Sequence, residues 1–401
     1  MTSNNKEHFP KRKAKLWSFS LMIFFIISLN FDWQKDYLFW YGSISFVVLS
    51  YLISFKEIHF KNLGFLGWLF SFIFLGAFSS VWSLSPSIVW EVVTPLLVCL
   101  FLLFLLQSSI YCGFDVDTMF RNYFIATLVN SIYVILMIDL SQLGEIQVGT
   151  QLLQGWNGNS IGFMAAHGAL IGSYLIKKTN SKLAKTFYIL SIAGLSLLTL
   201  YTGSRTAFIV LIGGICLFVF TSRPSKLVRN ALICAFVISV LFYIVMKTES
   251  FYAVLGSRLE GLFNLFSNEG EIDSSAKMRS IFIENGKEWF SQKPLLGYGL
   301  NNYKILNQSA TGRLTYSHNN FIEMAVNLGV FGLIWYYSIY GYLLVKLLKR
   351  AKENIFTAFM LSLLLCELVN HYGNVSYYDF YANLLLLLCF YATKKEAKLK
   401  E

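Results

Sequence analysis

Apolar runs of about 17 residues or more recur along the whole chain, and a helix of that length crosses the ~30 Å hydrocarbon core of a membrane. Charged residues make up 14% of the sequence, whereas soluble proteins carry about 25%. We therefore predict an all-α integral membrane protein with about twelve transmembrane helices and one long extracytoplasmic loop that contains interfacial helices. The expected spans cover residues 16–31, 37–55, 64–82, 88–106, 123–140, 160–176, 186–201, 207–220, 228–246, 321–345, 356–368 and 377–393. The first run lacks the small-residue cleavage site of a signal peptide, so we expect it to remain as an anchor.

Basic residues indicate the orientation of the spans. If the N-terminus is cytoplasmic and the spans alternate, most of the 33 Lys and Arg residues fall in cytoplasmic segments. This is the positive-inside pattern of short loops, so we expect both termini in the cytoplasm. The net charge of +11 is spread over these segments and forms no single stripe, which argues against a nucleic-acid partner.

The longest polar stretch, residues 247–317, is the expected extracytoplasmic loop between spans nine and ten of a single polytopic membrane domain, residues 1–401. The loop is too short to bury much of a core of its own. Residues 274–291 place apolar side chains at helical spacing, which predicts a helix that lies in the membrane interface with its aromatic face toward lipid. Pro294 ends this helix, and Gly297 and Gly299 then permit a tight turn.

The six cysteines show no metal-ligand spacing, and small apolar packing residues are the simplest interpretation. We expect no metal ion and no cofactor. The two halves of the chain show no internal repeat, which weakens the interpretation as an inverted-repeat transporter.

Three of the arginines on the expected outer face are candidate site residues. Arg205 follows a Gly-Ser turn and begins a helix, where its guanidinium fits a diphosphate through two parallel hydrogen bonds. An interface anchor that reaches lipid phosphate is the alternative role for this side chain. Arg258 and Arg279 lie in the long loop, where simple solvation is the alternative to substrate contact.

His318 ends the long loop and opens a long apolar segment. An imidazole with an unperturbed pKa of ~6.5 can accept a proton near neutral pH, although a histidine at a helix start is also common as a structural residue. Asn319 and Glu323 follow it, and Asn157 and Asn159 lie in an earlier turn on the same expected side.

The motifs occur in a recognisable order. N-G-N precedes the sixth span, G-S-R-T-A opens the eighth, and an arginine-containing helix leads to P-L-L-G-Y-G before S-H-N-N-F-I-E and L-G-V-F-G. This order resembles the O-antigen ligase and polysaccharide repeat-unit polymerase family, which comprises multi-span glycosyltransferases of the bacterial cytoplasmic (inner) membrane. The resemblance implies transfer of a glycan from an undecaprenyl diphosphate carrier to an acceptor sugar hydroxyl, with the active site on the extracytoplasmic face.

The resemblance also implies residue roles. His318 would remove the proton of the acceptor hydroxyl, and Arg205 and Arg279 would stabilise the leaving diphosphate, so that the anomeric centre inverts and no metal is needed. The expected substrate-binding residues are Asn157, Asn159, Arg258, Asn319 and Glu323. The expected partners are the undecaprenyl-diphosphate-linked oligosaccharide, an acceptor glycan and membrane lipid, with a flippase and a chain-length regulator as further candidates.

Within the family the start of the tenth span looks most like repeat-unit polymerases of capsule or O-antigen polysaccharide. A ligase that transfers glycan to a lipid A core or another acceptor shares the same motifs and is the main alternative. A flippase or other transporter would place charged residues at mid-membrane, whereas the polar residues here gather on one face. A non-catalytic scaffold leaves the outer Arg and His residues unexplained.

Overall fold

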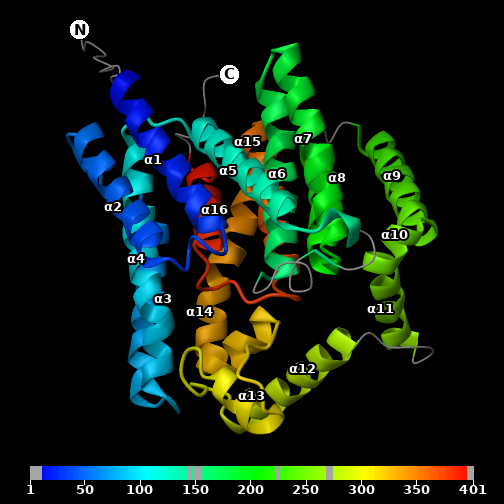
Figure 1. The fold of residues 1–401 in the computed structure, drawn as a ribbon. Helices are drawn as coiled ribbons and strands as arrows, with labels where there is room; N and C mark the ends of the chain where they lie inside the picture. Colours follow the sequence, from blue (N-terminus) through cyan, green and yellow to red (C-terminus); the bar gives the residue numbers. More distant parts are fainter. Residues whose placement is uncertain (1–10, 143–146, 149–155, 223–225, 268–273, 395–401) are drawn as a thin grey trace.

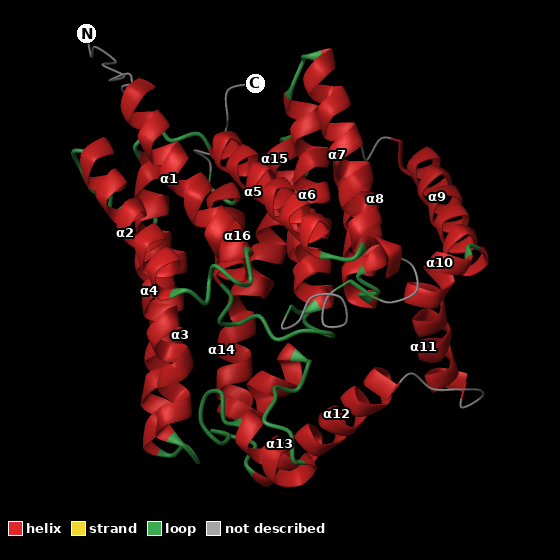
Figure 2. Cartoon of the chain, viewed as in Figure 1, coloured by secondary structure: helices red, strands yellow, loops and turns green. Residues whose placement is uncertain are grey.

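The structure is a computed structural model that describes residues 11–142, 147–148, 156–222, 226–267 and 274–394. Within these ranges the chain forms helices and loops without a strand (Figure 2). Each expected span falls on a helix: α1 (Lys11–Leu29), α2 (Tyr37–Ser54), α3 (Gly64–Phe78), α4 (Pro86–Tyr111), α5 (Val116–Met137), α6 (Gly158–Lys178), α7 (Lys182–Tyr201), α8 (Arg205–Ser222), α9 (Leu227–Lys247), α14 (Asn320–Arg350), α15 (Ile355–Asn370) and α16 (Phe380–Ala392).

Eight of the described helices are long and apolar enough to cross a membrane. They are α2, α3 with its 3-10 extension, α4, α5, α7, α8, α9 and α14. The apolar parts of α1, α15 and α16 are shorter, and α6 is long but more polar. An all-α multi-pass membrane protein is therefore confirmed, and the number of twelve spans stays a prediction.

The 247–317 segment is also helical and lies against one end of the membrane bundle (Figure 1). It contains α10 (Glu249–Phe251), a π-helical turn (Tyr252–Gly256), α11 (Ser257–Ser267), α12 (Ser274–Gln292) and α13 (Tyr303–Thr311). We call this end of the bundle the loop end. In Figure 1, α1 begins and α16 finishes at the opposite end, as the expected topology requires.

Carboxylate and amide side chains fix the starting points of several helices. Asp36 accepts hydrogen bonds from two backbone N–H groups of α2, and Asp115 does the same at α5. Asn354 and Asp379 cap α15 and α16 in the same way, each through one N–H. These caps satisfy N–H groups that have no partner within the helix, and they define where the chain leaves each loop.

Small residues let α6 lie close to its neighbours. A methyl group added at Gly168 would lie 2.4 Å from a Thr127 carbon on α5, and one added at Gly172 would lie 2.8 Å from the Phe124 ring. Close backbone approach at small residues is a common basis of helix packing in membranes. The position of α6 matters because its first turn forms one wall of the candidate site.

The helix α14 is broken at Gly329, where φ is +64° and ψ is −165°. The turn of the P-L-L-G-Y-G motif fills the break: the Val330 N–H donates to the Pro294 oxygen (2.8 Å), and the Tyr298 and Gly299 N–H groups donate to carbonyls of α14 (3.0 and 2.8 Å). A side chain at Gly329 would collide with the Leu295 backbone at 2.2 Å, so glycine is required there. The two motifs therefore form one interlocked unit.

The helix at Ser274–Gln292 confirms the element expected at 274–291, but its aromatic face does not lie toward lipid. Phe282 and Trp289 are buried together with Tyr298, Tyr303 and Val326. The Trp289 and Tyr303 rings make an edge contact at 5.2 Å. The loop has a small hydrophobic core after all, because α12 packs on α13 and on the first part of α14.

Candidate functional site

The turn at residues 201–206 joins α7 to α8 and contains the G-S-R motif. Gly203 adopts a φ of +62°, and a side chain there would lie 2.6 Å from the Val254 backbone oxygen. Arg205 is only 8% exposed, and its Nη1 donates to the Arg258 backbone oxygen (3.0 Å). The guanidinium is thus held at the start of α8 by the loop segment that follows α9.

Arg258 is not a solvated loop arginine. Its Nη1 donates to the Gly203 backbone oxygen (2.7 Å) and to Gln147 Oε1 (3.2 Å). The sequence gives no local signal for this contact, because the bonded residues are separated by 55 and 111 positions. The structure therefore brings Arg205 and Arg258 together at one turn.

The two candidate asparagines of α6 support the same turn. Asn157 accepts a hydrogen bond from the Asn159 backbone N–H (2.9 Å) and caps the helix. Asn159 Oδ1 accepts a hydrogen bond from the Ser204 hydroxyl (2.7 Å). These bonds position the residue next to Arg205, and a direct contact of either asparagine with substrate stays a prediction.

His318 lies in the turn before α14, and its side chain packs beside Phe282 of α12. It adopts a φ of +57°, which is uncommon for a residue with a side chain. Its ring lies 4.3 Å from the Tyr316 ring centroid and is nearly parallel to the Phe282 ring at 6.2 Å. Its Nδ1 is buried without a hydrogen-bond partner among the described residues.

Arg279 acts on this histidine through its charge. Burial, and secondarily the positive charge of Arg279, lower the pKa of His318 to about 4. The pKa of Tyr316 is raised by burial, and the Arg279 charge opposes that shift. Arg279 on α12 and His318 therefore share one electrostatic environment, and their roles in one reaction stay a prediction.

Glu323 and Asn319 hold the backbone around His318. Glu323 is buried and accepts a hydrogen bond from the Ser317 N–H (2.8 Å). Asn319 caps α14 by accepting from the N–H groups of Phe321 and Ile322 (3.0 and 3.1 Å). Both side chains thus have structural bonds, and substrate contact by either one stays a prediction.

The turn at 371–376, between α15 and α16, lies between the two candidate groups. The Asn320 N–H donates to the His371 backbone oxygen (2.8 Å), which joins this turn to the residue two places after His318. A methyl group added at Gly373 would lie 2.5 Å from Thr206 Oγ1, next to Arg205. One segment therefore contacts the neighbours of both Arg205 and His318, while their convergence on a single substrate stays a prediction.

A buried polar network supports the 371–376 turn. His371 Nδ1 lies 3.1 Å from the Tyr337 hydroxyl, and its Nε2 lies 3.3 Å from Glu367 Oε1. Ser376 also donates to Glu367 Oε1 (2.7 Å). The sequence signal for this network is a carboxylate and a histidine inside apolar sequence.

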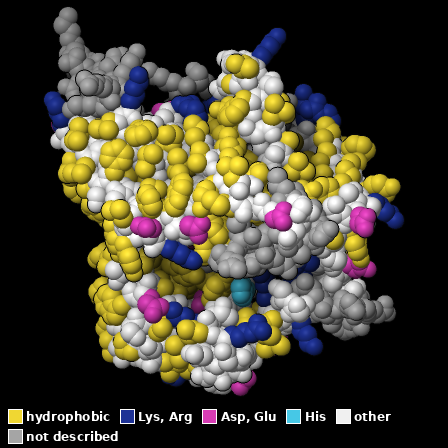
Figure 3. Space-filling model, viewed as in Figure 1, with side chains coloured by type: hydrophobic (Ala, Val, Ile, Leu, Met, Phe, Trp, Pro, Cys, Tyr) yellow, Lys and Arg dark blue, Asp and Glu magenta, His cyan; other side chains and the backbone are white. Residues whose placement is uncertain are grey.

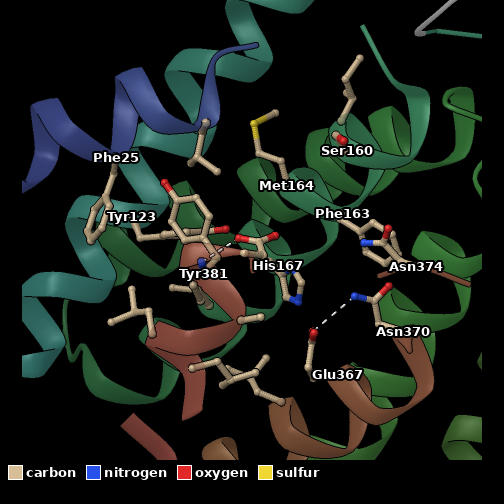
Figure 4. Close-up of a pocket in the computed structure, with 18 of the residues that line it drawn as sticks. Phe25, Tyr123, Ser160, Phe163, Met164, His167, Glu367, Asn370, Asn374 and Tyr381 are labelled. Atoms are coloured by element: carbon tan, nitrogen blue, oxygen red, sulfur yellow. Dashed lines mark hydrogen bonds between the residues drawn. The ribbon is translucent and has the colours of Figure 1, made fainter. Parts of the chain in front are cut away.

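Figure 3 shows a hollow between the bundle and the helices beneath it, with a histidine and Lys or Arg side chains at its edge. A separate cavity of about 250 Å³ lies inside the bundle (Figure 4). Residues of α1, α5, α6, α15 and α16 line it, and its polar wall includes His167, Glu367, Asn370, Asn374 and Asp379. Figure 3 shows Asp or Glu as well as Lys or Arg at the edge of the hollow, whereas the charged groups in the described lining of the cavity are carboxylates.

Comparison with known proteins connects this arrangement to a family. The family model described as O-Antigen ligase matches residues 188–337, a range that includes Arg205, Arg279 and His318. The teichuronic acid biosynthesis protein TuaE of Bacillus subtilis (strain 168) is 27% identical over 194 residues, covering 45% of this chain. The alignment spans only 39% of that relative's length. Both matches are similarities over part of the chain: it resembles the O-antigen ligase family over residues 188–337 and the TuaE protein over 45% of its length.

Proposed function

We propose that this protein is a capsule or O-antigen polysaccharide repeat-unit polymerase at the outer face of a bacterial cytoplasmic membrane. It transfers a glycan from a polyprenyl diphosphate carrier, undecaprenyl diphosphate in the family it resembles, to a sugar hydroxyl of an acceptor glycan. The main support is His318, whose Nδ1 is buried without a hydrogen-bond partner among the described residues and whose pKa is lowered by burial and by the charge of Arg279.

The proposed reaction exchanges one bond at the donor sugar. The acceptor hydroxyl oxygen attacks the anomeric carbon, the bond from that carbon to the diphosphate oxygen breaks, and the hydroxyl proton passes to neutral His318. Attack opposite the leaving group inverts the anomeric centre. Arg205, Arg258 and Arg279 supply positive charge where the diphosphate anion leaves, and this is the role that a metal ion would otherwise have.

The charge of Arg279 links donor binding to the strength of the base. In the unliganded protein, burial and this charge hold the pKa of His318 at about 4. A bound diphosphate brings negative charge that offsets the cation, which raises the pKa of the imidazole and makes it a better base. Proton removal from the acceptor is then favoured only when the donor is in place.

An O-antigen ligase is the alternative function, and the description of the matching family favours it. We prefer the polymerase because the start of the tenth span looks most like repeat-unit polymerases. A flippase is a weaker alternative, since it gives the unpartnered His318 nitrogen no role.

The test is transfer by the purified full-length protein with a lipid-diphosphate-linked repeat unit and a chelator. The wild type should make a ladder of polymer, and His318→Ala should reduce its rate by ~10²–10⁴ because general-base catalysis is lost. The melting temperature of this variant should stay close to that of the wild type. Full activity of His318→Ala, or an absolute need for added divalent metal, would contradict the mechanism.

The product distinguishes the two transferases. A polymerase gives products of many repeats, whereas a ligase gives one glycan joined to a different acceptor lipid. If the lipid-linked substrate stays chemically unchanged in every condition but moves from one leaflet of a vesicle to the other, the protein is a flippase.

The orientation is tested separately by labelling single cysteines in a background without native cysteine. We expect Ser309→Cys on α13 to react with a membrane-impermeant reagent in intact cells. Lys398→Cys near the C-terminus should react only after permeabilisation. The reverse pattern would place the site on the cytoplasmic side.

A further inference from the structure

We propose that the cavity between α1, α5, α6, α15 and α16 binds the uncharged, hydroxyl-rich sugar end of the acceptor glycan. This inference rests on the proposed function, since it assigns the second substrate of the same reaction. The cavity lies beside the candidate site because its polar wall on α15 leads directly into the 371–376 turn, whose His371 oxygen accepts from Asn320.

The charge of the cavity excludes the donor diphosphate as its occupant. Two carboxylates, Glu367 and Asp379, line it, and the described part of its lining contains no Lys or Arg. A diphosphate would be repelled by these carboxylates. Donor and acceptor are thus assigned to regions of opposite charge, with the arginines on one side and the carboxylates on the other.

The side chains of the cavity suit a sugar. Amides and carboxylates accept hydrogen bonds from hydroxyl groups, and Asn157, Asn374 and Glu367 offer such groups along one wall. Aromatic rings, including Trp156 and Phe163, form much of the remaining surface and can pack against the apolar faces of a sugar ring. A few convergent polar groups within a mostly apolar cavity are typical of small-molecule sites.

An unpartnered oxygen marks the polar wall. Asn370 is buried, and its Nδ2 donates to Glu367 Oε2 (3.4 Å), which fixes which end of the amide carries the oxygen. The Oδ1 atom has no hydrogen-bond partner among the described residues. A buried acceptor without a donor has lost its hydrogen bond to water, so a ligand hydroxyl that reaches it would be favoured. Figure 4 shows this side chain beside Asn374 and Glu367 at the edge of the cavity.

The experiment measures binding of a lipid-free, neutral repeat-unit oligosaccharide to the full-length protein in nanodiscs. Asn370→Ala removes the unpartnered oxygen and should weaken binding by about tenfold. Ser160→Trp fills the mouth of the cavity from an exposed position on α6 and should weaken binding further. Asn230→Ala is the matched control, because Asn230 is a buried amide on α9 and does not line the cavity.

A second measurement separates this inference from the proposed function. Binding of a polyprenyl diphosphate without sugar should be the same in Asn370→Ala, Ser160→Trp and the wild type. If Ser160→Trp weakens binding of the polyprenyl diphosphate and leaves the oligosaccharide unaffected, the cavity holds a hydrocarbon chain and the inference is wrong. If wild-type transfer proceeds and both variants keep the acceptor Kd and KM, the inference fails while the proposed function stands. Oligosaccharide binding that depends on the cavity, without any transfer, supports the sugar site and contradicts the polymerase.

Discussion

The turn at residues 201–206 and the turn at residues 317–320 hold their candidate residues in opposite ways. In the first turn, Arg205 donates to the Arg258 backbone and Arg258 donates to the Gly203 backbone, so the candidate side chains themselves maintain the turn. In the second turn, the backbone is held by neighbours of the candidate residue, and His318 Nδ1 has no hydrogen-bond partner among the residues described.

This difference predicts how mutations will behave. Where a functional side chain also supports the backbone, its loss should reduce activity and stability together. Where neighbours provide the support, activity and stability should be separable. The first turn belongs to the former class and the second to the latter.

The largest effect that tests this comparison is expected for Arg205→Lys. Lysine keeps the charge but loses the planar two-point donor, so transfer should fall by ~10²–10³. The bond to the Arg258 oxygen should weaken as well, which lowers the melting temperature. Activity and thermal unfolding are measured on the same preparation, with His318→Ala as the variant that loses activity alone. An unchanged melting temperature of Arg205→Lys would show that Arg205 does not support the first turn.

Loss of Arg258 should give the next largest effect. Arg258→Ala removes the donor to the Gly203 oxygen and to Gln147 and should lower the free energy of unfolding by about 1–3 kcal/mol, because a partly buried acceptor is left unpaired. Denaturant unfolding in detergent measures this, with Arg313→Ala on an exposed loop position as the control. If Arg258→Ala and Arg313→Ala have the same free energy of unfolding, Arg258 is a solvated loop residue and does not support the turn.

A smaller effect is expected at Glu323, which supports the second turn. Glu323→Ala removes the acceptor of the Ser317 N–H. The turn should then shift, which displaces His318 and reduces transfer. Glu323→Gln keeps an oxygen acceptor and should recover most of the activity. The comparison of kcat between the two variants tests this; equal losses in both would indicate that the carboxylate charge itself contacts substrate.

The smallest expected effect concerns pH. Because only the neutral imidazole can act as a base, and because burial and Arg279 lower its pKa to about 4, kcat/KM should persist below pH 6.5 and fall only toward pH 4. Arg279→Gln removes the smaller of the two causes of the lowered pKa, so the inflection in kcat/KM should move upward only part of the way to pH 6.5.

The free energy of unfolding should also decrease at low pH. Unfolded His318 takes up a proton near pH 6.5 and the folded residue only near pH 4, so the stability that the neutral imidazole contributes is lost as pH falls from 6.5 to about 4. An inflection already at 6.5 in the wild type would contradict the buried environment.

Much of the helical framework was predictable because it depends on local sequence. The apolar runs, the helix at Ser274–Gln292 and the positions of the caps each follow from residues close together in the chain. The prediction for α12 was wrong about the face that meets lipid, since the residues that cover Phe282 and Trp289 come from α13 and α14. Helical spacing shows that a face is apolar but does not show what covers it.

The candidate site was predictable only in part, for the same reason. The motifs singled out Arg205, Arg279 and His318, and their roles in one reaction stay a prediction. The role of Arg258 and the cavity bounded by α1 and α16 depend on contacts between distant segments, which no spacing rule encodes. Glu367 and Asp379 share one cavity only because five helices pack around it, and sequence spacing does not encode that packing.

The break in α14 at Gly329 has a consequence for the exchange of parts between related proteins. The turn that begins at Pro294 supplies the partners for the backbone groups around the break, so neither segment is complete alone. A chimera that imports a foreign outer loop but keeps its own tenth span should misassemble unless residues 294–302 and 326–330 are transplanted together. Residues 294–302 and 326–330 are thus the smallest set that must be exchanged together when donor or acceptor preference is moved between related proteins.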